Sequence, residues 1–413
     1  MSCTPRRSGR FLPALLCCFP WCLTVSCLPS LPDDSEGGRR TTSGGGASGR
    51  GSCGRGSWLP GWLEIHHIDA GEGVSTLIVS PTGRSLLIDA GEADWDSPRG
   101  AEVIGAYVRA VLGCAYLDYV LITHFHLDHV GAPGKGGLWH LVFEQGFGVG
   151  RLLHRDLHRN VGTRGATLEA WQVFLRSEEA RALNPMVAVV GSGQVELDGV
   201  AVAIAAVDGD GVLRPGDLSG DSSPPDENDY SIALLLRMGR LDYFTAGDLS
   251  GETLTASQGG YSYHDLETHA AALVKDVDVY RVSHHGSSHA SNATLLAQLA
   301  PRVSIVQVAD GNAYGHPSQA TLDRLAARSA VYLTQRGEPH TDLGLGKVVG
   351  HVVLRTADGI DFTVNGDVFT AADPVRVDLD GDGYFREVDP DDESALVVPS
   401  TNGGCDSYYE ACR

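Results

Sequence analysis

The segment Thr123-His124-Phe125-His126-Leu127-Asp128-His129-Val130-Gly131 constrains the fold of this chain most strongly. It follows the apolar run 119–122, which predicts a buried strand. Three imidazoles and one carboxylate within six residues cannot share one face of a helix or strand, so we expect a sharp turn that directs them into a common cleft. These donors suit zinc, and also manganese or iron when carboxylates take part. The alternative is a polar loop that is rich in histidine and binds no metal.

Runs with strand and helix patterns surround this segment on both sides. Two strand-rich halves with helices between them predict an α/β protein, an αββα sandwich of two packed sheets with helices outside. The predicted strands are 62–68, 76–79, 85–88, 119–122, 149–153, 200–204, 230–236, 241–245, 277–283, 303–306, 331–334, 352–354 and 362–364, and the predicted helices are 101–112, 166–182, 294–300 and 319–327.

Potential ligands and catalytic groups repeatedly follow the predicted strands. Asp89-Ala90-Gly91 ends the third strand, Ala246-Gly247-Asp248 follows a predicted hairpin, and His284-His285-Gly286-Ser287 follows the strand 277–283. Rigid strands fix ligand positions better than loops do, so this arrangement predicts a metal cleft at one edge of the sandwich.

With these motifs in this order, the chain resembles a metallo-β-lactamase-fold hydrolase over about residues 62–364. Within that superfamily it is similar to the metallo-hydrolase domain of ComEC competence proteins. The motifs that carry this resemblance are 88–91, 124–131, Asn228-Asp229-Tyr230-Ser231, 245–248, 283–287 and Asn312 to Pro317.

The resemblance implies a centre with two divalent metals, zinc or manganese. The ligands that it implies are His124 and His126 on the first metal, Asp128 and His129 on the second, Asp248 between the two, and His284 completing the second site. His285 could take the place of His284 and leave its neighbour to contact substrate. Asp89 would orient the ligand loop.

The third protein ligand of the first metal is not obvious from the sequence. His154 is the candidate, with Asp156 and His158 behind it, and the alternative for each is a plain surface residue. Asp128, His285 and His316 are the residues expected to act in catalysis, with Ser287 and His316 binding or protonating a phosphate or leaving group.

Two neighbouring cations would lower the pKa of a bridging water and supply hydroxide, which suits phosphodiesters. We therefore expect a phosphodiesterase or nuclease that acts on a nucleic acid or a small ester. The alternatives are a phosphocholine-esterase-like or other small-ester hydrolase, and a non-catalytic metal-binding scaffold.

The chain is expected to differ from ComEC proteins in three respects. We expect no transmembrane channel domain, and the glycine-rich turn at 70–74 lacks the family's aspartate. The formal net charge of -21 disfavours broad electrostatic binding of nucleic acid.

The N-terminal region predicts export. Arginines precede an apolar run, so residues 1–28 read as an export signal and residues 29–57, rich in Gly, Ser and Arg, as a flexible linker before a hydrolase domain at 58–370. Cys27 is a candidate lipid anchor, with simple cleavage as the alternative and a permanent membrane helix as the weaker reading. The protein is expected in the periplasm, outside the cell, or lipid-anchored outside the cytoplasm.

Residues 371–413 form an acidic tail. The spacing of its oxygen-bearing residues predicts an EF-hand-type calcium loop, and the alternative is a solvated acidic segment. The predicted calcium ligands are Asp378, Asp380, Asp382, Tyr384 and Asp389. In an exported protein Cys405 and Cys412 could close a small terminal disulfide loop.

Overall fold

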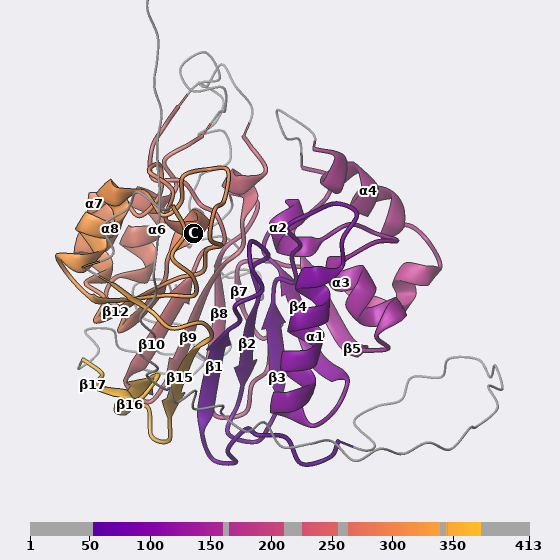
Figure 1. Ribbon diagram of the computed structural model, residues 1–413, viewed down its shortest axis with the longest axis horizontal. Helices are drawn as coiled ribbons and strands as arrows, with labels where there is room; N and C mark the ends of the chain where they lie inside the picture. Colours follow the sequence, from indigo (N-terminus) through magenta and orange to yellow (C-terminus); the bar gives the residue numbers. More distant parts are fainter. Residues whose placement is uncertain are drawn as a thin grey trace, which may run out of the picture. The chain divides into compact units, whose positions relative to one another are not determined.

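The computed structural model describes residues 53–159, 165–209, 225–254, 263–338, 344 and 346–372, and two β-sheets form its centre (Figure 1). In spatial order, the nine strands of the first sheet are β17 (Asp367–Thr370), β16 (Asp361–Val364), β15 (Val352–Thr356), β1 (Leu63–His67), β2 (Thr76–Val79), β3 (Ser85–Ile88), β4 (Tyr116–Ile122), β5 (Gly148–His154) and β6 (Pro185–Val187). Those of the eight-stranded second sheet are β14 (Gly346–Val348), β13 (Ala330–Leu333), β12 (Val303–Val306), β11 (Val279–Arg281), β10 (Leu241–Thr245), β9 (Ala233–Met238), β8 (Ala201–Ala206) and β7 (Gly191–Ser192).

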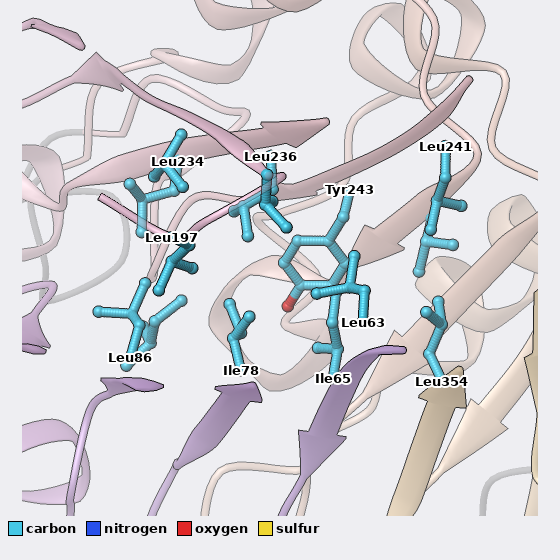
Figure 2. Close-up of a cluster of buried hydrophobic side chains, with 14 of the residues drawn as sticks. Leu63, Ile65, Ile78, Leu86, Leu197, Leu234, Leu236, Leu241, Tyr243 and Leu354 are labelled. Carbon is cyan, nitrogen blue, oxygen red and sulfur yellow. The ribbon is translucent and has the colours of Figure 1, made fainter. Parts of the chain in front are cut away.

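The two sheets pack face to face through apolar side chains that alternate along their strands. Leu63 and Ile65 of β1 enter the space between the sheets, where they belong to the same cluster as Leu234, Leu236 and Tyr243 of the second sheet (Figure 2). Successive side chains of a strand point to opposite faces of its sheet, so every second residue enters the space between the sheets and the others face the outer helices. Burial of this cluster keeps the spacing of the sheets fixed.

Helices cover the outer face of each sheet. Helix α1 (Arg99–Leu112) packs on the first sheet through Ile104 and Val108, beside the short α2 (Leu127–Val130), α3 (Gly137–Trp139) and α4 (Ala166–Phe174). Helices α6 (Glu267–Val274), α7 (Ala293–Leu299) and α8 (Gln319–Ala326) pack on the second sheet. Figure 1 shows the two groups on opposite sides of the sheets. The predicted αββα sandwich is confirmed.

Most predicted elements occur within a few residues of their expected positions, and the differences have local causes. The helix predicted at 166–182 ends at Phe174, and a separate 3-10 turn follows at Glu179–Leu183. Helix α6 was not predicted, because its small residues around Ala270 and Ala271 give a weak periodic signal. Strands β6 and β14 have three residues each, too few to show alternation.

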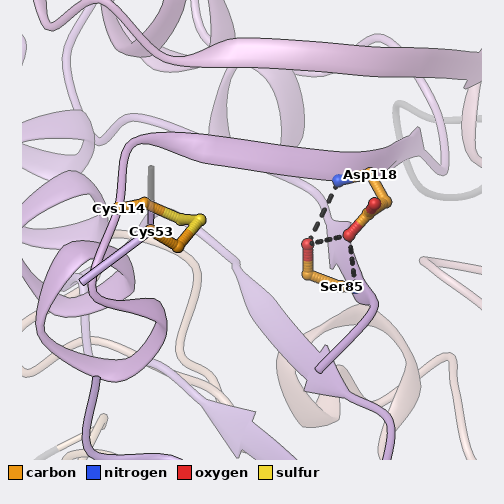
Figure 3. Close-up of a disulfide and its surroundings, with 4 residues drawn as sticks. All are labelled: Cys53, Ser85, Cys114 and Asp118. Carbon is orange, nitrogen blue, oxygen red and sulfur yellow. Dashed lines mark hydrogen bonds between the residues drawn. A yellow bond between two sulfur atoms is a disulfide. The ribbon is translucent and has the colours of Figure 1, made fainter. Parts of the chain in front are cut away.

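Residues 53–58 form a strap across the end of α1, although the sequence places 53–57 in the flexible linker. The strap donates backbone hydrogen bonds from Gly54 to the carbonyl of Gly113 (2.9 Å) and from Trp58 to that of Val111 (3.2 Å). Carbonyls at the end of a helix lack partners within the helix, so the strap caps them. A disulfide between Cys53 and Cys114 ties the strap to the turn before β4 (Figure 3). Residues 53–58 are therefore held against α1 by backbone hydrogen bonds and by the disulfide.

Several predicted features lie outside the described residues. They are the export signal, residues 29–52 of the linker, the candidate anchor Cys27, the calcium loop and the pair Cys405 and Cys412. Within the part of the chain that the structure describes, no helix has both the length and the apolar character needed to cross a bilayer.

We expect the double substitution Cys53→Ala and Cys114→Ala to lower the free energy of unfolding by about 2–4 kcal/mol, because the disulfide closes a long loop in the unfolded chain. Urea unfolding followed by circular dichroism measures this difference. A reductant should destabilise the natural protein by the same amount and leave the variant unchanged. Coincident unfolding curves for the two proteins without reductant would contradict the role given to the disulfide.

Candidate metal centre

The histidine-rich loop Thr123–Gly131 leaves the carboxyl end of β4, where its parallel neighbours β3 and β5 also end. The backbone N–H of Val74 donates to the carbonyl oxygen of Asp128 at 2.7 Å and holds the loop in place. Gly91 allows this close approach, because a Cβ there would lie 1.6 Å from the same oxygen. The segment before β2 and the turn after β3 together fix the position of the loop.

The second sheet contributes side chains from the ends of two parallel neighbours, β10 and β11. Asp248 follows β10, and its backbone N–H donates to Ser231 Oγ at 3.1 Å. His285 follows β11. The two sheets therefore present polar side chains at the same edge of the sandwich.

Four side chains, two from each sheet, form a compact group of potential metal ligands. Asp128, His129, Asp248 and His285 each offer one ligand atom, and these atoms all lie within 4.8 Å of one another. His285 Nε2 lies 3.0 Å from Asp128 Oδ2, and His129 Nε2 lies 3.2 Å from Asp248 Oδ1. Two imidazoles and two carboxylates form a donor set that suits zinc or manganese.

Whether this group fits a cation can be judged from the hydrogen bonds of its buried polar atoms. His129 Nε2 and Asp248 Oδ1 are both buried and lie 3.2 Å apart, and neither makes a hydrogen bond to any other described residue. A buried polar atom without a partner costs free energy. A bound divalent cation would satisfy both atoms, so the residues present fit a metal.

The predicted ligands of the first metal lie beside this group. His124 Nε2 and His126 Nδ1 are 3.1 Å apart, and the ring centroids of His124 and His129 are 4.1 Å apart. Burial, together with the nearby His129, lowers the pKa of His124 well below its usual value. A neutral imidazole is the form that binds a metal.

The geometry favours His285 over His284 as the ligand after β11. His285 Nδ1 donates a hydrogen bond to the carbonyl oxygen of Gln307 at 3.0 Å. This leaves His285 Nε2 directed at Asp128. His284 Nε2 lies 3.9 Å from Asp248 Oδ2, outside the four-residue group. Both histidines have a φ of 51°, which turns the backbone sharply and separates their side chains. His284 therefore lies beside the group rather than in it.

The other predicted site residues differ in their relation to the group. The ring of His316 stacks on that of His285 at 6.1 Å, and burial followed by the nearby His284 and His285 lowers the pKa of His316 to about 3. His154 Nδ1 donates to the carbonyl oxygen of Arg155 at 2.7 Å, and its ring lies against Phe125. His154 does not belong to the group.

Asp156 and His158, which the sequence places behind His154, contact each other rather than the group. The backbone N–H of His158 donates to Asp156 Oδ1 at 2.9 Å. Neither residue therefore lies in the group of potential ligands found among the described residues.

The ionisable side chains of the group hold opposite charges. Burial alone would lower the pKa of His129, but the carboxylates of Asp248, Asp89 and Asp128 outweigh it and raise that pKa to about 10. Burial would raise the pKa of Asp128 and Asp248, but His129 and neighbouring histidines hold both well below their usual range. A cation that binds Nε2 of His129 therefore replaces a proton.

Sequence reasoning did not identify Arg281, a fully buried residue in β11. Its Nη1 donates to the carbonyl oxygen of Gly247 at 2.7 Å and lies 3.7 Å from Asp248 Oδ1. The signal was present, because an arginine inside the apolar run 277–283 needs a buried partner.

Comparison with known proteins finds a family resemblance around the histidine-rich loop. A family model described as the metallo-beta-lactamase superfamily matches residues 68–135. This match covers the loop with His124, His126, Asp128 and His129, and the two-sheet sandwich agrees with it. Over this segment the chain is similar to the metallo-beta-lactamase superfamily, and its mixed α/β architecture with two packed sheets is the one expected from that resemblance.

Among individual proteins, the chain is similar to ComE operon protein 3 of Bacillus subtilis (strain 168), with 25% identity over 284 residues. That alignment covers 64% of this chain and 31% of the relative, so the chain spans about a third of the relative's length. Solved structures with a similar fold include CmlA, a diiron beta-hydroxylase from Streptomyces venezuelae (16% identity, TM-score 0.39, 71% of this chain and 54% of that one). Another is the metallo-beta-lactamase fold protein YhfI from Bacillus subtilis (12% identity, TM-score 0.38, 67% and 98%).

We expect His285→Ala to reduce the tightly bound zinc from two ions per chain to one, because Nε2 of His285 belongs to the ligand group. His284→Ala should keep both ions. Equilibrium dialysis followed by elemental analysis measures the ratio of zinc to protein. The reverse pattern, with one ion lost only in His284→Ala, would show that His284 is the ligand.

Proposed function

We propose that this chain is an exported, dinuclear metal-dependent hydrolase that cleaves phosphodiester bonds. The observation that carries the proposal is the convergence of Asp128, His129, Asp248 and His285 from two sheets, with two buried ligand atoms that lack hydrogen-bond partners among the described residues. A structural cation would need only a closed set of ligands. Here His284 and His316 also border the group and lie outside the four residues that form it.

The chain's own residues divide between the two cations. His124 and His126 would hold the first, and Asp128, His129 and His285 the second. Asp248, which belongs to the same group as the ligands of the second, would serve both, as the resemblance implies. When bound, two divalent cations lower the pKa of a water molecule to near neutral and offset charge on the attacking and leaving oxygens of a phosphodiester.

The roles of His316 and His284 follow from their positions beside the ligand group. The imidazole of His316 is held parallel to that of His285 and edge-on to that of His284, with 5.5 Å between the centroids of the latter pair. The backbone N–H of His316 donates to Asn312 Oδ1 at 3.0 Å, which fixes the loop that carries it. We assign His316 and His284 to binding the phosphoryl group and orienting the leaving group.

The disulfide between Cys53 and Cys114 supports export, because disulfides form and persist mainly in oxidising compartments. The order of arginines, apolar run and polar linker in residues 1–57 supports it independently. Anchoring through Cys27 is part of the same proposal.

We expect the protein, stripped with a chelator and reloaded with zinc or manganese, to hydrolyse bis-p-nitrophenyl phosphate. Asp248→Asn should lower kcat/KM by more than about 100-fold, because loss of a residue that merely orients a ligand already costs up to about that factor. Asp242→Asn is the matched control, since Asp242 is equally buried in the same sheet but pairs with Arg237 away from the site. Release of p-nitrophenol measures the rate.

Further substrates separate the alternatives. Turnover of phosphocholine esters with no activity on phosphodiesters would favour the small-ester hydrolase. A protein that binds two metals but is inactive on bis-p-nitrophenyl phosphate, DNA and phosphocholine esters would be a non-catalytic scaffold.

A further inference from the structure

Arg155, directly after β5, is a fully buried cation outside the group of metal ligands. Its Nε donates to Glu227 Oε1 at 2.7 Å, and its Nη2 donates to Glu227 Oε2. The guanidinium also lies over the rings of Phe125 and Tyr230, at 5.7 Å and 5.2 Å from their centroids. Two parallel hydrogen bonds between arginine and a carboxylate fix the carboxylate in direction as well as position.

Glu227, which is 3% exposed, connects this ion pair to the ligand loop. Its Oε1 accepts the backbone N–H of Phe125 at 2.8 Å. Phe125 lies between His124 and His126, so this N–H belongs to the short stretch of backbone that carries both imidazoles. The carboxylate therefore holds the peptide from which the two ligands project.

Asp89 holds the two ends of the loop, at Thr123 and at His129. Its Oδ1 accepts the N–H of Thr123 and its Oδ2 accepts the hydroxyl of Thr123, both at 2.8 Å. Asp89 Oδ2 also accepts a hydrogen bond from Nδ1 of His129 at 2.8 Å. Asp89 thus anchors Thr123 and orients His129, while Glu227 holds the peptide between His124 and His126.

The segment held by Glu227 carries His124 and His126, and the first metal site that they form has fewer ligands than the second. His154, the candidate third ligand of the first metal, donates its Nδ1 proton to the carbonyl of Arg155 and does not belong to the ligand group. With two imidazoles supplying most of the first site, its affinity depends strongly on their mutual orientation.

We propose that the Arg155–Glu227 pair is a positioning device for the first metal, acting through the N–H of Phe125. This inference rests on the proposed metal centre but not on its hydrolytic activity. Glu227 and Arg155 contact neither metal nor substrate in this scheme, so their substitution should change metal affinity at one site and leave the other site unchanged.

Single-site backgrounds test the device through metal binding alone. His285→Ala leaves the first site, and His126→Ala leaves the second. Adding Glu227→Gln or Glu227→Asp should raise the zinc dissociation constant about 10–100-fold in the His285→Ala background, the range for loss of a group that orients a ligand. Neither addition should change it in the His126→Ala background. Competition with a chromogenic chelator measures both constants.

Two comparisons keep the proposal falsifiable. Glu227→Asp retains the charge beside Arg155 and withdraws the carboxylate from Phe125, so it separates the N–H contact from the ion pair. Asp242→Asn breaks another buried pair, in which Arg237 Nε donates to Asp242 Oδ1 at 2.8 Å, and should leave both dissociation constants unchanged.

Unchanged zinc affinity of the first site in Glu227→Asp, or equal losses at both sites, would overturn the proposal. A natural protein that binds no zinc would overturn it as well. Two bound zinc ions without ester hydrolysis would refute the hydrolase while the selective effect of Glu227 remained measurable.

Discussion

The separation between the two sheets is the constraint on which the site depends. Asp128 and His129 project from the edge of the first sheet, whereas Asp248 and His285 project from the second. Distances of 3.0 and 3.2 Å between ligand atoms across this gap persist only if the sheets cannot slide or separate. The apolar cluster between the sheets supplies that rigidity, because close-packed interiors resist small displacements.

Burying this many charged and polar groups is costly unless each has a partner. The side chains around the centre meet this condition through atoms that face away from the metal position. His129 Nδ1 bonds to Asp89, and His285 Nδ1 bonds to the backbone of Gln307. These contacts leave the opposite atoms directed at the centre, so the same bonds that stabilise the fold also orient the ligands.

The sequence predicts the sandwich and the ligand loop because both have local signals. Strands such as 85–88 show continuous apolar runs, and the loop compresses its donors into six residues. The choice between His284 and His285 has no such signal, since adjacent residues separate only through the φ values and the partner of each ring. The pairing of Arg155 with Glu227 spans 72 positions in the chain, and nothing in either local sequence announces the other.

The disulfide between Cys53 and Cys114 was likewise not predicted, because its cysteines are far apart in the sequence. Its position shows that the two ends of β4 have different roles. Cys53 and Cys114 are 61 positions apart, and spacing alone favours the nearer pair Cys405 and Cys412. In the fold, the disulfide lies at the amino end of β4, on the side where Asp118 accepts hydrogen bonds from the backbone and hydroxyl of Ser85 (Figure 3). The histidine-rich loop leaves the carboxyl end of the same strand. Cross-links at the amino ends of β3 and β4 therefore stabilise the sheet without restricting the loops at the opposite edge, where ligands of parallel strands gather.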